Sequence, residues 1–157
     1  MKLGLIADSH DNLTKLAKAI KLFNREKLDL VFHAGDFIAP FTLDLFAKLN
    51  CEYLGVFGNN DGEREGLSNK SEGRIKADPL KLNKANRKIL LIHDISNLDS
   101  KNKNYDLVVY GHSHKKEASL RDSTLFINPG ECGGWLTGKS SVAIIDLLKM
   151  KVKFFKL

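Results

Sequence analysis

The sequence predicts one α/β domain. Six short apolar runs, rich in Val, Ile, Leu and Phe, are nearly continuous rather than alternating, which is typical of strands with both faces covered. Amphipathic helical segments separate the first three runs, and this strand–helix alternation indicates βαβ units. The chain of 157 residues shows no repeat, low-complexity segment or linker. Residues 1–157 are therefore expected to form a single domain.

A hairpin and a final pair of strands are also expected. The hairpin expected over 79–92 has its turn near 83–86, and residues 141–157 predict two more strands around a turn near 148–150. The second half is therefore strand-dense. The six apolar runs that predict the other strands occupy residues 2–8, 28–36, 52–61, 88–94, 105–112 and 124–130.

Two helices are expected between the first three strands. Apolar side chains recur with helical spacing over 13–23, and Asn12 is a plausible N-cap. A second such pattern over 41–49 follows Pro40, a residue that suits a first helical turn. Residues 62–76 are polar and dotted with glycine, and they predict a surface loop or a short helix.

The composition excludes several classes of protein. The hydrophobic fraction of 43% and the charged fraction of 28% are ordinary for a globular protein. No apolar run approaches the roughly 18 residues of a membrane span, and the N-terminal segment is no signal peptide. Cys51 and Cys132 fit neither a zinc ribbon nor a disulfide framework, so both are expected to stay reduced in the cytoplasm.

The net charge of +6 and the pI near 9.3 raise the question of nucleic acid. The lysines are scattered along the chain, however, and no stacking aromatic residues are interleaved with them. A lysine-rich surface is therefore favoured over a dedicated nucleic-acid face.

Polar side chains stand where five of the expected strands end. The carboxyl ends of parallel strands form the crevice in which ligands bind, so these residues can converge. Two carboxylates, one amide and four imidazoles suit Mn²⁺, Fe, Zn²⁺ or Ni²⁺ better than Ca²⁺ or a soft metal. Seven donors exceed the needs of one tetrahedral ion and suit two ions that share a carboxylate. The seven residues are Asp8, His10, Asp36, Asn59, His93, His112 and His114.

Taken singly, each segment also has an ordinary structural explanation. Asp8 can cap a helix beside a surface histidine, Gly35–Asp36 can form a turn, and His93 can be a core histidine. The strongest single indication of metal binding is segment 111–114, in which a glycine precedes two histidines. The shared position at strand ends favours a joint metal site. His33 lies inside a strand and is expected to be structural.

In order, these segments resemble the calcineurin-like metallophosphoesterase superfamily, and in particular its small bacterial and archaeal phosphodiesterase branch. The resemblance runs from LIADSHDN through HAGDF, VFGNNDGE, LLIHD and YGHSH to FINPGECGG. It implies a four-layer α-β-β-α sandwich, with two mixed β-sheets flanked by helices and a two-metal centre at the strand ends. The NPGE segment at 128–131 would fix a turn beside that centre.

The resemblance also implies an activity, the hydrolysis of small phosphodiesters by a metal-bridging hydroxide. Two divalent ions are expected, with Mn²⁺ or Ni²⁺ as first choices and Zn²⁺, Fe²⁺ or Mg²⁺ as alternatives. Substrate-binding residues are not assigned, and a homodimer is compatible with the family. The implied ligands are Asp8, His10 and His114 for the first ion, Asn59, His93 and His112 for the second, and Asp36 as the bridge.

Two positions depart from the family pattern. Many members carry a histidine after the metal-binding asparagine, which protonates the leaving group. Here that catalytic position holds Asn60, which cannot transfer a proton at neutral pH, so good leaving groups should be favoured. The second departure is HDIS at 93–96, where relatives often have His–Gly–His. Asp94 adds a carboxylate near the second metal, and Ile95 lacks an imidazole.

Three functions compete. A metal-dependent phosphodiesterase is favoured because all seven ligands are present. A non-catalytic scaffold, as in the retromer subunit of the same fold, would be indicated by lost ligands. A nuclease is encouraged by the positive charge, since Lys101, Lys103, Lys115 and Lys116 follow metal-binding segments and can attract phosphate. The chain has no appended nucleic-acid module.

Overall fold

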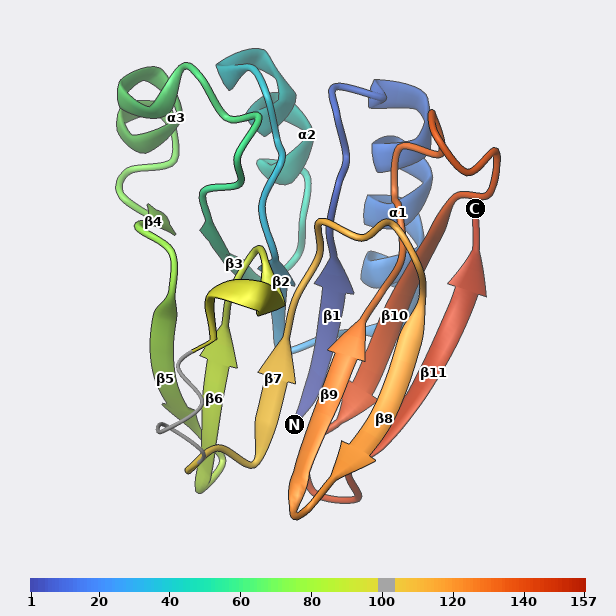
Figure 1. Ribbon diagram of the computed structural model, residues 1–157. Coiled ribbons are helices and arrows are strands. Elements are labelled where there is room, and N and C mark those ends of the chain that lie inside the picture. Colours follow the sequence, from blue (N-terminus) through green and yellow to red (C-terminus); the bar gives the residue numbers. More distant parts are fainter. Residues whose placement is uncertain (99–103) are drawn as a thin grey trace.

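The computed structural model describes residues 1–98 and 104–157, and in it two mixed β-sheets pack face to face (Figure 1). The first sheet has the strand order β11-β10-β1-β2-β3-β4. The strands β1 to β4 pair in parallel, whereas β10 pairs antiparallel with both β1 and β11. The strands are β1 Lys2–Ile6, β2 Leu30–His33, β3 Glu52–Val56, β4 Ile75–Lys76, β10 Ser141–Asp146 and β11 Lys151–Lys156.

The second sheet has the order β5-β6-β7-β9-β8. Its centre, β6-β7-β9, is parallel, and an antiparallel strand closes each edge. The carboxyl ends of β1, β6 and β7 therefore lie at the same end of the sandwich, as Figure 1 shows. The strands are β5 Leu80–Lys84, β6 Arg87–Leu91, β7 Leu107–Val109, β8 Glu117–Arg121 and β9 Thr124–Asn128.

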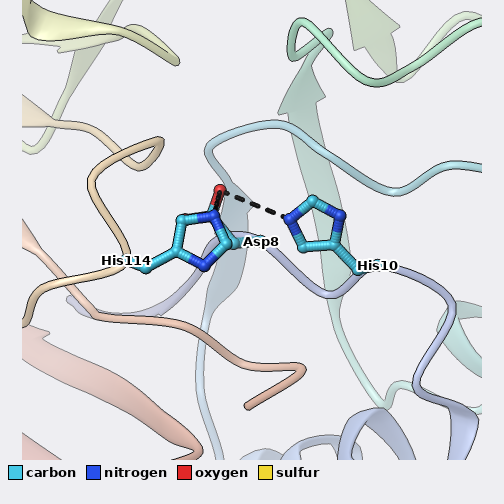
Figure 2. Close-up of side chains that lie close together, drawn as sticks. All are labelled: Asp8, His10 and His114. Carbon is cyan, nitrogen blue, oxygen red and sulfur yellow. Dashed lines mark ion pairs between the residues drawn. The ribbon is translucent and has the colours of Figure 1, made fainter. Parts of the chain in front are cut away.

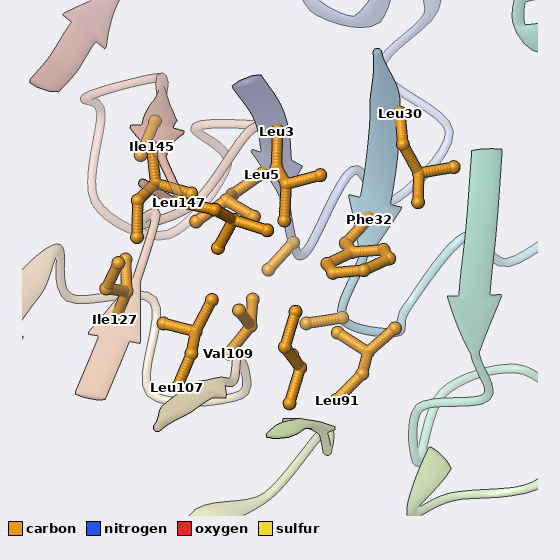
Figure 3. Packing of buried hydrophobic residues seen from close by; sticks show 14 of the residues in the cluster. Leu3, Leu5, Leu30, Phe32, Leu91, Leu107, Val109, Ile127, Ile145 and Leu147 are labelled. Carbon is orange, nitrogen blue, oxygen red and sulfur yellow. The ribbon is translucent and has the colours of Figure 1, made fainter. Parts of the chain in front are cut away.

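The main core lies between the two sheets (Figure 3). Alternate residues of β1, Leu3 and Leu5, point into it and meet Leu91 and Val109 from the other sheet, all of them fully buried. Burial of such a side chain contributes roughly 1.5–3 kcal/mol, so this layer holds the sheets in register. The fixed register in turn fixes where the strand ends meet.

In the described part of the chain, three α-helices and one 3-10 helix cover the outer face of the first sheet. The longest is α1 (Leu13–Glu26), whose N-cap is Asn12 as predicted, since the Asn12 side chain accepts a hydrogen bond from Lys15 N. The short helices η1 (Pro40–Thr42), α2 (Leu43–Phe46) and α3 (Arg64–Lys70) complete this layer. The second predicted helix, over 41–49, is thus a 3-10 turn followed by one turn of α-helix.

The outer face of the second sheet carries a much thinner layer. Its buried residues Leu90, Val108 and Tyr110 pack against Ile95 and Leu98, around the 3-10 turn η2 (Ile95–Asn97). The predicted sandwich of two mixed sheets is confirmed, and in the described ranges the fourth layer reduces to this single turn. No helix of residues 1–98 or 104–157 is long and apolar enough to cross a membrane.

All six predicted strands form, and so do the hairpin β5–β6 and the final pair β10–β11. The strands are shorter than the apolar runs because the polar residues that follow them belong to loops. Two strands were not predicted. The strand β4 has only two residues, and β8 reads EASLR, a mostly exposed edge strand without an apolar pattern.

Candidate metal centre

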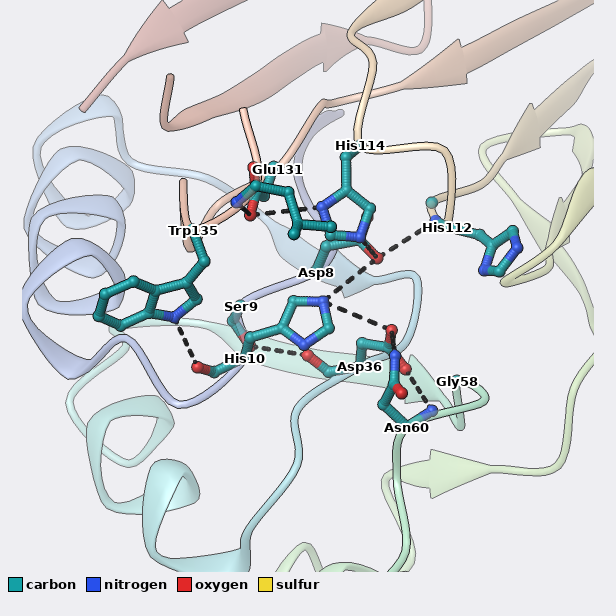
Figure 4. Close-up of polar contacts among 12 residues, drawn as sticks. Asp8, Ser9, His10, Asp36, Gly58, Asn60, His112, His114, Glu131 and Trp135 are labelled. Atoms are coloured by element: carbon teal, nitrogen blue, oxygen red, sulfur yellow. Dashed lines mark hydrogen bonds and ion pairs between the residues drawn. The ribbon is translucent and has the colours of Figure 1, made fainter. Parts of the chain in front are cut away.

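All seven predicted ligands meet at one end of the sandwich, where the loops after β1, β2, β3, β6 and β7 converge. Figure 4 shows five of them: Asp8, His10, Asp36, His112 and His114. The topology explains the meeting, because each loop leaves the carboxyl end of its strand, and β1, β2 and β3 in one sheet and β6 and β7 in the other pair in parallel. Residues that are as far apart in the chain as Asp8 and His114 thereby come within 3.6 Å of each other.

The Asp36 carboxylate lies at the middle of this group. Its Oδ2 atom is 3.5 Å from Nε2 of His10 and 3.6 Å from Nε2 of His93. Asn60 also donates to it, through its backbone N–H to Oδ1 at 2.9 Å and through its side-chain amide to Oδ2 at 2.8 Å. One carboxylate oxygen thus faces histidines from both sides.

Asp8, His10 and His114 form the first side (Figure 2). Oδ1 of Asp8 is 4.0 Å from Nε2 of His10 and 3.6 Å from Nε2 of His114. The three residues can each direct one ligand atom into the same small volume. The second predicted group is equally close, since Oδ1 of Asn59 is 2.8 Å from Nε2 of His93 and 2.9 Å from Nδ1 of His112.

The electrostatics of the site fit a cation. Asp8 and Asp36 are both buried, and burial together with the Asp36 charge raises the pKa of Asp8 to about 8. Burial lowers the pKa of His10, which favours the neutral imidazole that a metal binds. Oδ2 of Asp8 and Nε2 of His10 are buried without a hydrogen-bond partner among the described residues. A divalent ion between these groups would satisfy both atoms and offset the repulsion of the two carboxylates.

Three oxygen atoms stand behind the histidines. Nδ1 of His93 lies 2.7 Å from the carbonyl oxygen of Ala34, and Nδ1 of His114 lies 3.3 Å from Oε1 of Glu131. Nε2 of His112 lies 3.7 Å from Oδ2 of Asp94, the residue that departs from the family pattern. The contact with Ala34 is a hydrogen bond and fixes the ring orientation and tautomer of His93. Glu131 and Asp94 lie at ion-pair distance from their histidines, and Nδ1 of His114 has no hydrogen-bond partner among the described residues. The roles of Glu131 and Ala34 were not predicted, because neither lies near its histidine in sequence.

Asp61 is a further residue that the sequence did not single out for its role. Its buried carboxylate accepts three backbone N–H groups, from Asp36 at 3.0 Å, from Ile38 at 2.7 Å and from Gly58 at 2.7 Å. These bonds tie the loop after β2 to the loop after β3. Asp61 therefore holds Asp36 in place, rather than standing free beside Asn60.

The backbone at the site is strained. Positive φ angles occur at five of the seven predicted ligands, a conformation that costs about 1–3 kcal/mol for residues other than glycine. Strain of this kind persists where the surrounding structure imposes it, and it clusters at functional sites. The five angles are 53° at Asp8, 43° at His10, 62° at Asp36, 64° at His112 and 58° at His114.

His33 lies outside the group, as predicted. It is fully buried, its ring stacks on Phe37 at 3.6 Å between centroids, and its Nε2 atom is 3.0 Å from Oγ of Ser9. Burial holds its pKa well below the usual value, so the ring is neutral. Cys51 and Cys132 are free thiols.

Comparison with known proteins assigns the family. The sequence profile of the calcineurin-like phosphoesterase superfamily domain matches residues 1–150. The chain belongs to this superfamily. Its members are phosphoesterases, and membership of the superfamily implies that divalent metal ions are bound. The seven converging donors agree with that chemistry.

Individual relatives and solved structures resemble this chain over nearly its whole length. A phosphodiesterase of Methanocaldococcus jannaschii is 37% identical over 161 residues, which cover 98% of this chain and 97% of the relative. A solved archaeal phosphodiesterase superposes with a TM-score of 0.94 at 36% identity, with both chains fully covered. A phosphoesterase of E. coli shares the fold, with a TM-score of 0.76 at 21% identity over 100% of this chain and 98% of that one. Kinship with phosphodiesterases supports a hydrolase activity for this calcineurin-like phosphoesterase.

Gly58 provides a test of the site geometry of this phosphoesterase. A Cβ atom at Gly58 would lie 2.1 Å from Oδ1 and 2.5 Å from the backbone nitrogen of Asp36, so Gly58→Ala must displace that carboxylate. We expect Mn²⁺ affinity, measured by calorimetry, to fall by more than roughly tenfold. Gly62→Ala is the matched control, since nothing lies within 4 Å of a Cβ there. Equal affinities in the two variants would contradict the geometry.

The raised pKa of Asp8 predicts a pH dependence of the metal-free phosphoesterase. A carboxyl group whose folded-state pKa is about 8, against an ordinary 3.8, contributes stability below pH 4 that is lost as the pH rises through 8. Asp8→Asn removes this loss. The Tm of metal-free Asp8→Asn minus that of the native protein should therefore be larger at pH 8.5 than at pH 5, by roughly 4 °C or more.

The control for this measurement is Asp122→Asn, a change in the exposed turn between β8 and β9. Its Tm difference from the native protein should stay constant over the same pH range. A constant difference for Asp8→Asn as well would mean that Asp8 is ionised in the folded, metal-free protein.

Proposed function

We propose that this chain hydrolyses small phosphodiesters at a dinuclear metal centre. In this proposal Asp36 is the shared ligand, and the observation that carries it is the place of Asp36 Oδ2, 3.5 Å from His10 and 3.6 Å from His93. The residues assigned to the first ion are Asp8, His10 and His114, and those assigned to the second are Asn59, His93 and His112.

The residues around the site have separate tasks in this reaction. Two divalent ions, when bound, supply a hydroxide near neutral pH and neutralise charge on the phosphate oxygens. The Asp36 carboxylate supplies the negative charge that holds both sites together, and Asp61 fixes its backbone. Ala34 orients His93 through a hydrogen bond, and the carboxylates of Glu131 and Asp94 lie at ion-pair distance from His114 and His112. Asn60 occupies the position beside the leaving group, where it can donate a hydrogen bond but no proton.

The donor set also bears on the choice of ion. Four imidazoles, two carboxylates and one amide oxygen favour borderline divalent ions, and Mn²⁺ or Ni²⁺ are our first choices. No thiolate takes part, because the Cys132 thiol is buried and its pKa is raised to about 12 by burial. The complete ligand set favours an enzyme over a non-catalytic scaffold of the same fold.

A metal-resolved activity screen tests the proposal. Metal-free protein is loaded in turn with Mn²⁺, Ni²⁺, Zn²⁺, Fe²⁺ and Mg²⁺, and then assayed with bis(4-nitrophenyl) phosphate, 4-nitrophenyl phosphate and a cyclic nucleotide. We expect metal-dependent hydrolysis, fastest for the aryl diester. Hydrolysis of the monoester alone, or no hydrolysis with any ion, would overturn the proposal. Metal content measured on the same samples shows whether two ions are bound per chain.

A further inference from the structure

A groove of about 590 Å³ opens beside His114, between the segment that leads into β8 and the end of β11. One wall carries Lys115 and Lys116, and the other carries Phe154 and Lys156. Lys139 lies in the loop that follows the buried Glu131, the partner of His114. The groove therefore borders the first group of ligands at His114, and Asp36 does not line it.

The charge of this groove is entirely positive. Four lysines line it, and no aspartate or glutamate does. Within residues 1–98 and 104–157, the only lysine in an ion pair is Lys70, which pairs with Asp44 elsewhere on the surface. The four groove lysines are exposed and keep their donors available. Lysines that converge from both walls and remain without carboxylates favour an anion between them.

The groove on the other side of the site differs in charge. It measures about 480 Å³, borders His93 and His112, and carries the carboxylates of Asp78 and Asp94. Its one cation, Arg64, already donates to the backbone carbonyls of Asp61 and Gly58. The two substituents of a phosphodiester at the metal centre can therefore enter two grooves that differ in charge. An anionic substituent is favoured only in the groove lined by lysines.

We propose that the lysine groove binds a second, terminal phosphate group of the substrate. The inference rests on the proposed function and specifies it: the preferred substrates are small phosphodiesters that carry a phosphate monoester on one substituent. A terminal phosphate bears close to two negative charges. It therefore gains more binding free energy from several converging ammonium groups than a singly charged diester does.

The size of the groove favours a small molecule over a nucleic-acid strand. A volume of about 590 Å³ is that of a pocket for one ligand. A strand would need an extended cationic track with aromatic platforms for its bases. The two phenylalanines that line the groove already have lysines over their rings: Nζ of Lys116 lies 5.8 Å from the centroid of Phe154, and Nζ of Lys153 lies 5.0 Å from that of Phe155. Lys101 and Lys103, also expected to attract phosphate, lie outside the described residues.

A matched pair of substrates tests the inference. Thymidine 5′-(4-nitrophenyl phosphate) and its 3′-phosphorylated derivative share the scissile bond and the leaving group, and they differ only in the terminal phosphate. We expect the 3′-phosphorylated ester to have the lower KM, by roughly tenfold at low salt, with a similar kcat. The advantage should shrink at high ionic strength, because exposed charges are screened. Equal KM values would overturn the inference.

Charge variants locate the effect. The double variant Lys139→Ala/Lys156→Ala should raise KM for the phosphorylated ester by roughly tenfold and KM for the plain ester by less than about threefold. The control Lys149→Ala/Lys151→Ala removes the same charge at the opposite end of β11, and it should leave both KM values in place. Equal increases of KM in the two double variants would show a general effect of net charge and overturn the groove assignment.

Binding measurements separate this inference from the proposed function. Calorimetric titration with thymidine 3′,5′-bisphosphate and with thymidine 5′-monophosphate, with and without Mn²⁺, needs no turnover. Tighter binding of the bisphosphate, lost in Lys139→Ala/Lys156→Ala, supports the groove even if no ester is hydrolysed, in which case only the proposed function fails. Single-stranded DNA cleaved faster than the phosphorylated ester would overturn the assignment to a small substrate.

Discussion

Asp36→Asn should lower kcat/KM for bis(4-nitrophenyl) phosphate by at least about a hundredfold, more than the 10- to 100-fold typical of residues that only orient a metal ligand. Oδ2 of Asp36 stands between His10 and His93, so an uncharged amide weakens both proposed metal sites at once. Metal content per chain, measured by mass spectrometry, should fall together with activity. Circular dichroism checks that the variant is folded.

Two variants serve as controls for Asp36→Asn. His33→Gln changes a residue three positions away that stacks on Phe37 and contacts Ser9, so it should lower the Tm but keep the metal content. Asp122→Asn makes the same chemical change in an exposed turn and should alter neither quantity. If Asp36→Asn retained full metal content and turnover, the bridging role would be wrong.

Asn60→His should change how the rate depends on the leaving group. An asparagine can donate a hydrogen bond to the departing oxygen, whereas a histidine can also transfer a proton. General acid catalysis contributes about 10²–10⁴-fold, mostly for poor leaving groups. The native protein should therefore hydrolyse aryl diesters far faster than alkyl ones. In Asn60→His the alkyl rate should rise more than the aryl rate.

The measurement is a series of diesters with graded leaving-group pKa, run on both proteins with the same metal. Its outcome is the slope of log kcat/KM against leaving-group pKa, which should be shallower for Asn60→His. Asn60→Gln is the matched control, since it changes the side chain without adding a proton donor. Equal slopes for the native protein and Asn60→His would place the leaving group elsewhere or assign its protonation to another residue.

The structure also restricts how a histidine at this position could be supported. The side-chain amide and the backbone N–H of Asn60 both donate to Asp36. The carboxylate of Asp61, next in the chain, is buried and already accepts three backbone N–H groups, so we do not expect it to orient a new imidazole. We therefore expect Asn60→His to recover only part of the general acid effect.

The sequence by itself determined the fold class and predicted which candidate ligands meet. Continuous apolar runs predict buried strands, and the polar residue that ends such a run must stand at a strand end, since burial in the middle of the sheet would cost too much. Asp8, Asp36 and His93 were found in this way. The rule is local, so it works from a single sequence.

Only the tertiary structure decided the residues that act from a distance. Glu131 lies 3.3 Å from His114 because β7 and β9 are neighbouring parallel strands, and Asp61 accepts N–H groups from Asp36 and Ile38 because β2 and β3 are neighbours in the same way. The edge strand β8 escaped prediction for a related reason: its exposed residues need no apolar pattern, since hydrogen bonds to β9 hold it.

The lysine groove is the clearest feature that only the tertiary structure reveals. Lys116 and Lys156 are 40 positions apart, and in sequence they are two members of a scattered set of surface lysines. They line one groove because the ends of β8 and β11 flank the same edge of the sandwich. Local patterns specify which residues are buried or stand at strand ends, whereas the convergence of exposed charges depends on strand order, which hydrogen bonds between distant segments establish.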